Sequence, residues 1–468
     1  MPIQLKPSEF VVPTDKPFAN DKLERNKCAD SLTNLVQNVP GPLVISINGG
    51  WGTGKTVFLR MWKQHLQNSS FTTIYFNAWQ DDYCHDPLIA LIGQIWNELK
   101  SSDFKEIAKS VKECAAPVFR TTIFNAVRTA TAGRVDLNEA QLKSISEKAV
   151  DDYVTAGEKL KDLRNRLGEL AQKVCQKGKP LIIIIDELDR CRPTFAIELL
   201  EKVKHLFDTP GILFVLGIDR EQLGHSIKCV YGQEMNVNGY LRRFIDIEFI
   251  LPEANPGVFV SHLFAQLGLH EYFEKHPRGI TINDKTELEI VFPKLCACFQ
   301  LSLRDVEHCC RLFALVYMNI EANDFIYPYL STTLVILKLF NNKLYHHYVS
   351  GHCNSEEVIK FILDQPRGEA FLNTREGTLI EAHLFAASPK NWRDPALYQM
   401  RQRFEKRELI QPEFLPERIK KMRNDEFERL FKAYFGVVNQ SGNSISNFTL
   451  SSLSKKIELA SLMIDYRE

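Results

Sequence analysis

The residues best suited to chemistry lie in the stretch NGGWGTGKT, where Gly49, Gly54, Lys55 and Thr56 fill the fixed positions of G-x-x-x-x-G-K-[ST]. Backbone N–H groups of such a loop converge on phosphate oxygens, which requires glycine because side chains would prevent so close an approach. Lys55 would reach the β- and γ-phosphates, and the Thr56 hydroxyl would take one position on Mg²⁺. The predicted nucleotide contacts are Gly50, Trp51, Gly52, Thr53, Gly54, Lys55, Thr56 and Val57.

A second chemical element follows the apolar run Leu181–Ile185, which leads directly into Asp186 and Glu187. Five consecutive aliphatic residues are typical of a strand buried on both faces of a parallel sheet. In a chain that also has a phosphate-binding loop, we expect Asp186 to hold Mg²⁺ through its water shell. Glu187 is then placed to orient and polarise the attacking water. The alternative is a strand that simply ends in a charged turn.

Other polar residues follow or precede the remaining apolar runs. Asp219 follows the run at 212–216, where a polar sensor would lie between the phosphate-bearing and carboxylate-bearing strands. Arg242 and Arg243 precede a further predicted strand, and Arg304 lies at the start of a helix. An arginine at a helix start opposes the helix dipole, so an external phosphate is a reasonable partner for it. The alternative for all three arginines is pairing with acidic neighbours on the surface.

These residues require a sheet to position them. Apolar runs predict five strands with helices between them. The first strand begins at Leu43, and the others span 71–77, 181–186, 212–216 and 245–251. This order predicts an α/β fold with a doubly wound parallel sheet that binds ligands at the carboxyl edge of its strands. The second strand delivers Asp81, Asp82 and Asp86 toward that edge, although a solvated turn explains them equally well. The segment 21–25 either lies over the base of a nucleotide or only packs as a helix.

The rest of the chain is predicted to be helical. Residues of about 101–178 form an insertion. From Leu142 it is predicted to be a long helix, in which apolar positions from Ala156 to Val174 alternate spacings of four and three. Such a stripe either binds a coiled-coil partner or packs inside its own domain. We expect a nucleotide-binding core at 1–252 that contains this insertion, a helical lid at 253–330 and a C-terminal helical domain at 331–468.

The amino-acid composition limits the binding partners and the cellular compartments that we expect for this protein. Lys plus Arg equals Asp plus Glu at 58 each, so no overall charge attracts nucleic acid or an anionic membrane, and only local patches remain possible. No run of about 18 apolar residues predicts a membrane span, and we see no export signal. Eleven scattered cysteines favour a cytoplasmic location. Those at 296, 298, 309 and 310 lack zinc-site spacing and are expected to be buried thiols.

The motifs NGGWGTGKTVFL, FNAWQ, IIIIDELDRC, FVLGIDRE and YLRRFIDIEF resemble those of the KAP family of P-loop NTPases, over residues of about 15–345. This family is related to AAA+ and STAND proteins. The resemblance implies ATP hydrolysis with Mg²⁺, a sensor strand between the loop and carboxylate strands, and an all-helical lid. Many members carry transmembrane helices in the insertion, whereas this sequence has no such span there. Several relatives look like components of bacterial antiviral systems.

The resemblance also suggests roles for the arginines. In AAA+ relatives an arginine before the fifth strand is offered to the neighbouring subunit, while one on the lid senses the γ-phosphate of its own subunit. By this resemblance Arg242 or Arg243 acts in trans and Arg304 acts in cis, which requires a homo-oligomer.

Two functional classes remain open. The protein is either an ATPase that drives or times the assembly of a complex with a protein effector, or a nucleotide-gated scaffold with little turnover that recruits a separate effector. The intact Glu187 favours the first class.

Overall fold

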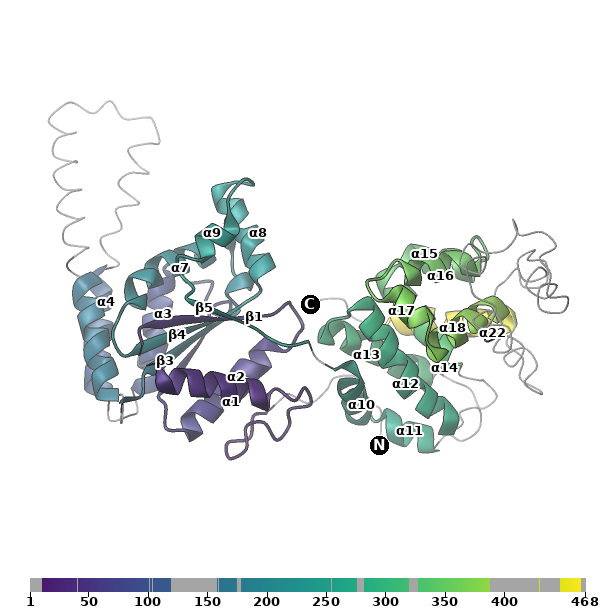
Figure 1. Ribbon diagram of the computed structural model, residues 1–468, viewed down its shortest axis with the longest axis horizontal. Helices are drawn as coiled ribbons and strands as arrows, with labels where there is room; N and C mark the ends of the chain where they lie inside the picture. The colour runs from purple at the N-terminus through teal and green to yellow at the C-terminus, as the bar shows by residue number, and fades with distance from the viewer. Residues whose placement is uncertain are drawn as a thin grey trace, which may run out of the picture. The chain divides into compact units, whose positions relative to one another are not determined.

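The computed structural model describes two compact units, Phe10–Glu253 and Ala254–Glu468 (Figure 1). The described residues are 11–39, 41–100, 102, 104–118, 158, 160–174, 178–253, 255–275, 282–319, 327–387, 429 and 447–463. Each unit has its own hydrophobic core, and each is considered by itself.

The first unit is built on a parallel sheet of five strands in the order β2-β3-β4-β1-β5. The strands are β1 (Leu43–Asn48), β2 (Thr73–Asn77), β3 (Leu181–Asp186), β4 (Ile212–Ile218) and β5 (Ile247–Ile250). The predicted doubly wound α/β fold is therefore confirmed. The sensor strand β4 lies between β1, which leads into the phosphate-binding loop, and β3, which ends at Asp186, as the family resemblance implied.

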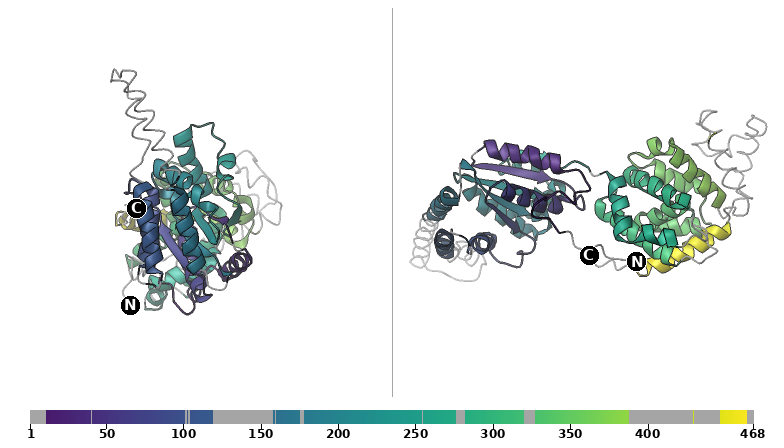
Figure 2. Two further views of the ribbon diagram at one scale, coloured as in Figure 1. Left: turned by 90° about the vertical axis from the view of Figure 1, so that its left-hand side faces the viewer. Right: turned by 90° about the horizontal axis from the view of Figure 1, so that it is seen from below.

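Helices cover both faces of this sheet, as Figures 1 and 2 show from different directions. One face of β3, with Ile182 and Ile184, packs against α1 (Asn26–Asn38) and α2 (Lys55–Asn68). The other face, with Ile183 and Ile185, packs against three further helices. These are α3 (Pro87–Leu99), α7 (Pro193–Phe207) and α8 (Arg220–Tyr231). Successive side chains of a strand point to opposite faces, so burial on both sides explains the unbroken aliphatic run.

The insertion adds helical layers to the same core. α4 (Lys105–Val118) packs against α3, and residues 160–174 form a helix whose Leu163, Leu167, Leu170 and Val174 are buried. These side chains belong to the core cluster that includes α3 and α7. The structure therefore shows that this part of the apolar stripe packs inside its own unit. The remainder of the long helix predicted from Leu142 lies outside the described residues.

Two short elements complete the first unit near the candidate site. A 3₁₀ turn, η2 (Leu188–Arg190), follows the acids at the end of β3, and α9 (Val237–Leu241) precedes β5.

The second unit is helical throughout its described part. Its helices are α10 (Pro256–Gln266), α11 (Leu269–Lys275), α12 (Ile282–Phe299), α13 (Leu303–Met318), α14 (Pro328–Phe340), α15 (Asn342–Val349), α16 (Ser355–Leu363), α17 (Gly368–Leu372), α18 (Arg375–Ala387) and α22 (Asn447–Ser461). They share one hydrophobic core, which includes the cysteines at 296, 298, 309 and 310. Burial raises the pKa of Cys298 to about 11, so this thiol stays protonated at neutral pH.

Within the described ranges, no cluster of histidine, cysteine and acidic side chains is arranged to hold a metal ion. No helix in the same ranges has the length and apolarity needed to cross a membrane.

Candidate nucleotide site

The loop at 49–54 connects the carboxyl end of β1 to the first turn of α2. Gly52 and Gly54 have φ values of 74° and 83°, a left-handed conformation that glycine adopts without a steric cost. The Thr53 hydroxyl donates a hydrogen bond of 2.8 Å to the carbonyl of Gly50 and so closes the turn. The backbone thus has the glycine-dependent curvature expected of a phosphate-binding loop.

Lys55, the first residue of α2, folds back over this loop. Its Nζ donates a hydrogen bond of 2.8 Å to the Gly49 carbonyl and lies 3.8 Å from Oδ1 of Asp189. Burial lowers the pKa of Lys55, while the nearby carboxylates of Asp189 and Asp186 act in the opposite direction. The ammonium group is therefore held at the loop by acceptors that a phosphate could replace.

Trp51 links the loop to two acidic side chains. Its backbone N–H donates to Oδ2 of Asp219 at 3.1 Å, and its indole Nε1 donates to Oδ2 of Asp189 at 2.5 Å. Asp219 also caps α8 by accepting from the N–H groups of Glu221 and Gln222. Asp219 thus lies beside the loop, at the position where a polar sensor was expected.

The carboxylate of Asp186 is completely buried at the end of β3. It accepts hydrogen bonds from the Tyr75 hydroxyl at 2.7 Å and from the Glu187 N–H at 2.8 Å. Burial raises the pKa of Asp186, and the Tyr75 hydrogen bond opposes this effect. Two donors therefore fix the orientation of the carboxylate that is expected to hold Mg²⁺.

Glu187 turns back toward the loop because its backbone has a φ of 59°, which is uncommon for a residue with a side chain. Its Oε1 accepts from the Thr56 hydroxyl at 3.2 Å and lies 3.0 Å from the guanidinium of Arg190. Its Oε2 accepts from the Asn77 amide at 2.9 Å. The structure thus brings together Thr56 on α2 and Glu187 after β3.

Gly217 on β4 makes room for this arrangement. A Cβ at this position would lie 2.5 Å from Oδ1 of Asp186 and 2.5 Å from Cδ1 of Leu59. Both distances are shorter than the contacts that Cβ atoms make in real structures. The strand between loop and acids must therefore lack a side chain at Gly217 if Asp186 is to keep its position.

The donor set suits a magnesium nucleotide. The Thr56 hydroxyl and the Asp186 carboxylate supply the hard oxygen ligands that Mg²⁺ prefers, and Lys55 supplies a cation for the phosphates. When bound there, Mg²⁺ would neutralise charge on the phosphate oxygens. The residues present therefore fit the group that the sequence predicts.

The predicted arginines lie on other elements than the residues of this cluster. Arg304 belongs to the second unit, where it is an exposed residue in the first turn of α13. This helix begins with a capping box between Ser302 and Asp305. Arg242 and Arg243 are exposed between α9 and β5. In the described part of the chain, none of the three arginines forms an ion pair with an acidic side chain.

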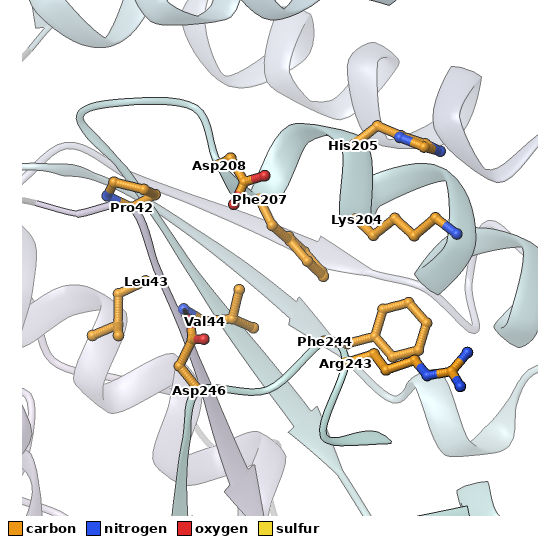
Figure 3. Close-up of a pocket in the computed structure, with 10 residues that line it drawn as sticks. All are labelled: Pro42, Leu43, Val44, Lys204, His205, Phe207, Asp208, Arg243, Phe244 and Asp246. Atoms are coloured by element: carbon orange, nitrogen blue, oxygen red, sulfur yellow. Dashed lines mark hydrogen bonds between the residues drawn. The ribbon is translucent and has the colours of Figure 1, made fainter. Parts of the chain in front are cut away.

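Arg243 lines a pocket of about 640 Å³ at the amino end of β1 (Figure 3). In the figure the ends of Lys204, His205 and Arg243 lie on the same side of this pocket. The phosphate-binding loop follows the opposite, carboxyl end of β1. Six residues of strand separate the two ends by roughly 17 Å, so Arg243 does not face the loop of its own subunit.

Of the remaining candidates, two of the three aspartates after β2 stabilise local structure. Asp82 accepts from the Arg192 backbone N–H at 2.8 Å, and Asp86 caps α3 and pairs with Lys202 at 2.8 Å. Upstream of the sheet, the buried guanidinium of Arg25 donates to the Pro252 carbonyl at 3.1 Å. A packing role is thus visible for these residues, whereas contact with a nucleotide stays a prediction.

Sequence reasoning assigned no role to Asn77, Tyr75, Asp189 or Arg190, although all four contact the predicted site residues. Asn77 ends the second predicted strand, and Asp189 and Arg190 belong to DELDR. The polar side chains of these residues, within or shortly after predicted strands, were therefore the signal in the sequence that could have indicated a role at the site.

The parallel sheet, the glycine-rich loop and the acids beside it define a P-loop NTPase domain. The model of the KAP family P-loop domain matches residues 25–319, so the chain belongs to the KAP family. Among curated proteins, an uncharacterized protein of Methanocaldococcus jannaschii is 25% identical over 173 residues, covering 31% of this chain and 89% of that protein. The phage T7 exclusion protein of Escherichia coli is 21% identical over 260 residues, covering 50% of this chain and 33% of that protein.

Solved structures show only remote likeness. The Aeropyrum pernix ORC1 protein in complex with DNA has a TM-score of 0.34 at 12% identity, covering 98% of this chain and 86% of that one. PCH-2 of C. elegans has a TM-score of 0.30 at 12% identity, covering 68% and 69%. Scores this low support no inference about the function of this chain.

The close contact at Gly217 leads to a prediction. Gly217→Ala should lower the free energy of unfolding by about 1–3 kcal/mol, because the new methyl group displaces Asp186 or Leu59 from a packed position. Chemical denaturation measures this change. Gly93→Ala on α3 is the matched control, since a Cβ there meets nothing within 4 Å, and it should be neutral or stabilising by up to about 1 kcal/mol. Equal stability of the two variants would contradict the steric argument.

Proposed function

We propose that this KAP protein binds Mg²⁺ and ATP at the loop between β1 and α2 and hydrolyses ATP. The contact that carries the proposal is the hydrogen bond of 3.2 Å between Thr56 and Glu187. It joins the predicted metal ligand of the loop to the predicted water-activating acid of β3. In this proposal Lys55 binds the β- and γ-phosphates, Asp186 holds the hydrated Mg²⁺, and Glu187 orients the attacking water.

We further propose that hydrolysis drives or gates assembly of a protein complex that includes an effector. Arg242 or Arg243 would complete the site of a neighbouring subunit, while Arg304 would sense the γ-phosphate in its own. Support comes from the exposure of Arg242 and Arg243 and from the distance of Arg243 from its own loop. Three unpaired guanidinium groups in the described structure also speak against simple surface ion pairs.

A second candidate function is a nucleotide-gated scaffold that turns over slowly and recruits a separate effector. The observation that favours it is the engagement of both Glu187 carboxylate oxygens by protein donors. A carboxylate held in this way is less available to water. Steady-state turnover well above about one per minute would favour the ATPase, and near-zero turnover with ATP-dependent assembly would favour the scaffold.

The biological setting we propose is defence against phage. It is supported by the partial similarity to the phage T7 exclusion protein, of whose length the chain spans about a third. A cytoplasmic location would suit this role.

The nucleotide roles are tested by two substitutions with different expected outcomes. Lys55→Ala should abolish ATP binding, because the phosphates lose their cation. Glu187→Gln should keep ATP bound and stop its hydrolysis, because the loop and Asp186 remain intact. Binding is measured with a fluorescent ATP analogue and turnover by phosphate release. Lys63→Ala is the matched control on α2, since Lys63 pairs with Glu98 at 2.9 Å and not with the loop. Wild-type affinity of Lys55→Ala, or wild-type turnover of Glu187→Gln, would refute the assigned role.

The arginine roles are tested by mixing inactive subunits. One subunit carries Lys55→Ala and keeps its arginines, while the other carries Arg242→Ala and Arg243→Ala and keeps its loop. If either arginine acts in trans, the mixture should recover ATPase activity, because the first subunit supplies its arginine to the ATP bound by the second. An inactive mixture, or a fully active monomer, would rule this out.

The proposed defence role is tested in a phage-sensitive host. Expression of the wild-type protein should reduce the number of T7 plaques, and Lys55→Ala should restore it, because assembly requires bound ATP. Lys63→Ala again serves as the control. Equal plaque counts with wild-type protein and empty vector would contradict this role.

A further inference from the structure

The carboxylate of Glu187 is nearly buried and is held by donors from three different elements. The Asn77 amide at the end of β2 binds Oε2 at 2.9 Å, whereas Thr56 on α2 and Arg190 in η2 both approach Oε1, at 3.2 and 3.0 Å. The Glu187 side chain is only 9% exposed. These three donors take most of the acceptor positions of the carboxylate, so a water molecule that needs it as a base competes with protein donors.

Asn77 connects Glu187 to the loop that follows β2. Its Oδ1 accepts hydrogen bonds of 3.1 Å from the backbone N–H groups of both Trp79 and Gln80. The same amide thus binds Glu187 through its nitrogen and the loop through its oxygen. The loop at 79–80 and the Glu187 carboxylate therefore share Asn77 as a hydrogen-bond partner.

Arg190 provides a second connection between the same loop and Glu187. Its guanidinium carbon lies 5.3 Å from the centre of the Trp79 ring, within the range of a cation–π contact. Arg190 therefore bridges the ring and the carboxylate, and its position depends on both. Trp79 itself is 50% exposed.

The far side of this loop is tied to the chain just beyond Arg190. The Arg192 backbone N–H donates to Oδ2 of Asp82 at 2.8 Å, and the Arg192 side chain bonds the same carboxylate. The loop is thus attached on both sides of Arg190, which keeps the Trp79 ring in place over the guanidinium.

We propose that Arg190, supported by Trp79, is a positioning residue that holds Glu187 back from the attacking water and so limits basal ATP turnover. This inference rests on the hydrolysis proposed above. Arg190 pairs with Oε1 of Glu187, the oxygen that also accepts from Thr56. Because Thr56 is a predicted metal ligand, Oε1 is the oxygen on the predicted metal and phosphate side. Loss of Arg190 leaves Asn77 to orient the carboxylate and removes one of the two protein groups on Oε1, which makes this oxygen more accessible to water.

A purely stabilising role for Arg190 makes the opposite prediction. If the guanidinium served only to balance a nearly buried carboxylate, its removal would weaken the fold around Glu187 and lower turnover. The direction of the change in kcat therefore separates restraint from structural support.

The test uses Arg190→Ala and Trp79→Ala in the full chain, with Tyr83→Ala as the matched control for losing an exposed aromatic residue. Tyr83 is 82% exposed and lies on the same connection between β2 and α3. Both test variants should raise kcat about threefold to tenfold with the dissociation constant for ATP unchanged, because only the availability of Glu187 changes. Trp79→Phe keeps a ring under the guanidinium and should restore most of the restraint.

The outcomes also separate this inference from the proposed function. If the wild-type protein hydrolyses ATP and both Arg190→Ala and Trp79→Ala lower the turnover or leave it unchanged, the proposed restraint is wrong. The proposed hydrolysis is not contradicted by that result. Bound ATP without turnover in the wild type and in every variant overturns both. Because Trp79 lies at the surface, its substitution tests the inference even if Arg190→Ala does not fold, and thermal unfolding identifies that case.

Discussion

The structure of the first unit depends on the close passage of β4 between the two strands that carry the chemistry. In the parallel register, Gly217 lies beside Ile47 on one side and beside Asp186 on the other. The loop after β1 and the acids after β3 are thus one strand apart, at a separation set by strand spacing. Because Gly217 has no Cβ, the Asp186 carboxylate can occupy the space next to β4. The aliphatic side chains on both faces bury these strands in the core of the unit.

Around this arrangement, the polar groups of the site bind one another. Lys55 is held by the Gly49 carbonyl and approaches Asp189, while Glu187 is held by Asn77 and Arg190. Buried polar groups need partners, so each internal bond stabilises the protein when no phosphate is present. In the proposed function these bonds would be exchanged when nucleotide binds, and their strength would oppose binding and reaction.

The sequence was informative where a local pattern determines the chemistry. The glycines, Lys55 and Thr56 lie within eight residues, and Asp186 and Glu187 directly end an aliphatic run, so their positions at one sheet edge followed from the fold class. The contacts of Asn77 and Arg190 with Glu187 could not be predicted in the same way. Asn77 and Glu187 are 110 residues apart, and their meeting depends on strand order, register and the left-handed backbone of Glu187. The positions of Arg242, Arg243 and Arg304 beside a phosphate stay predictions, because they involve another subunit or the second unit.

Trp51 gives the loop a property that is independent of catalysis. Its indole is 46% exposed, yet its nitrogen donates to a buried carboxylate, that of Asp189. An indole has an apolar body and one polar group, so its surroundings change when that hydrogen bond is exchanged. Trp62, by comparison, lies fully buried with its nitrogen bonded to Thr33. One of the five tryptophans of the chain therefore lies within the loop, so a variant that keeps Trp51 as its single tryptophan would report an exchange of this hydrogen bond through its intrinsic fluorescence.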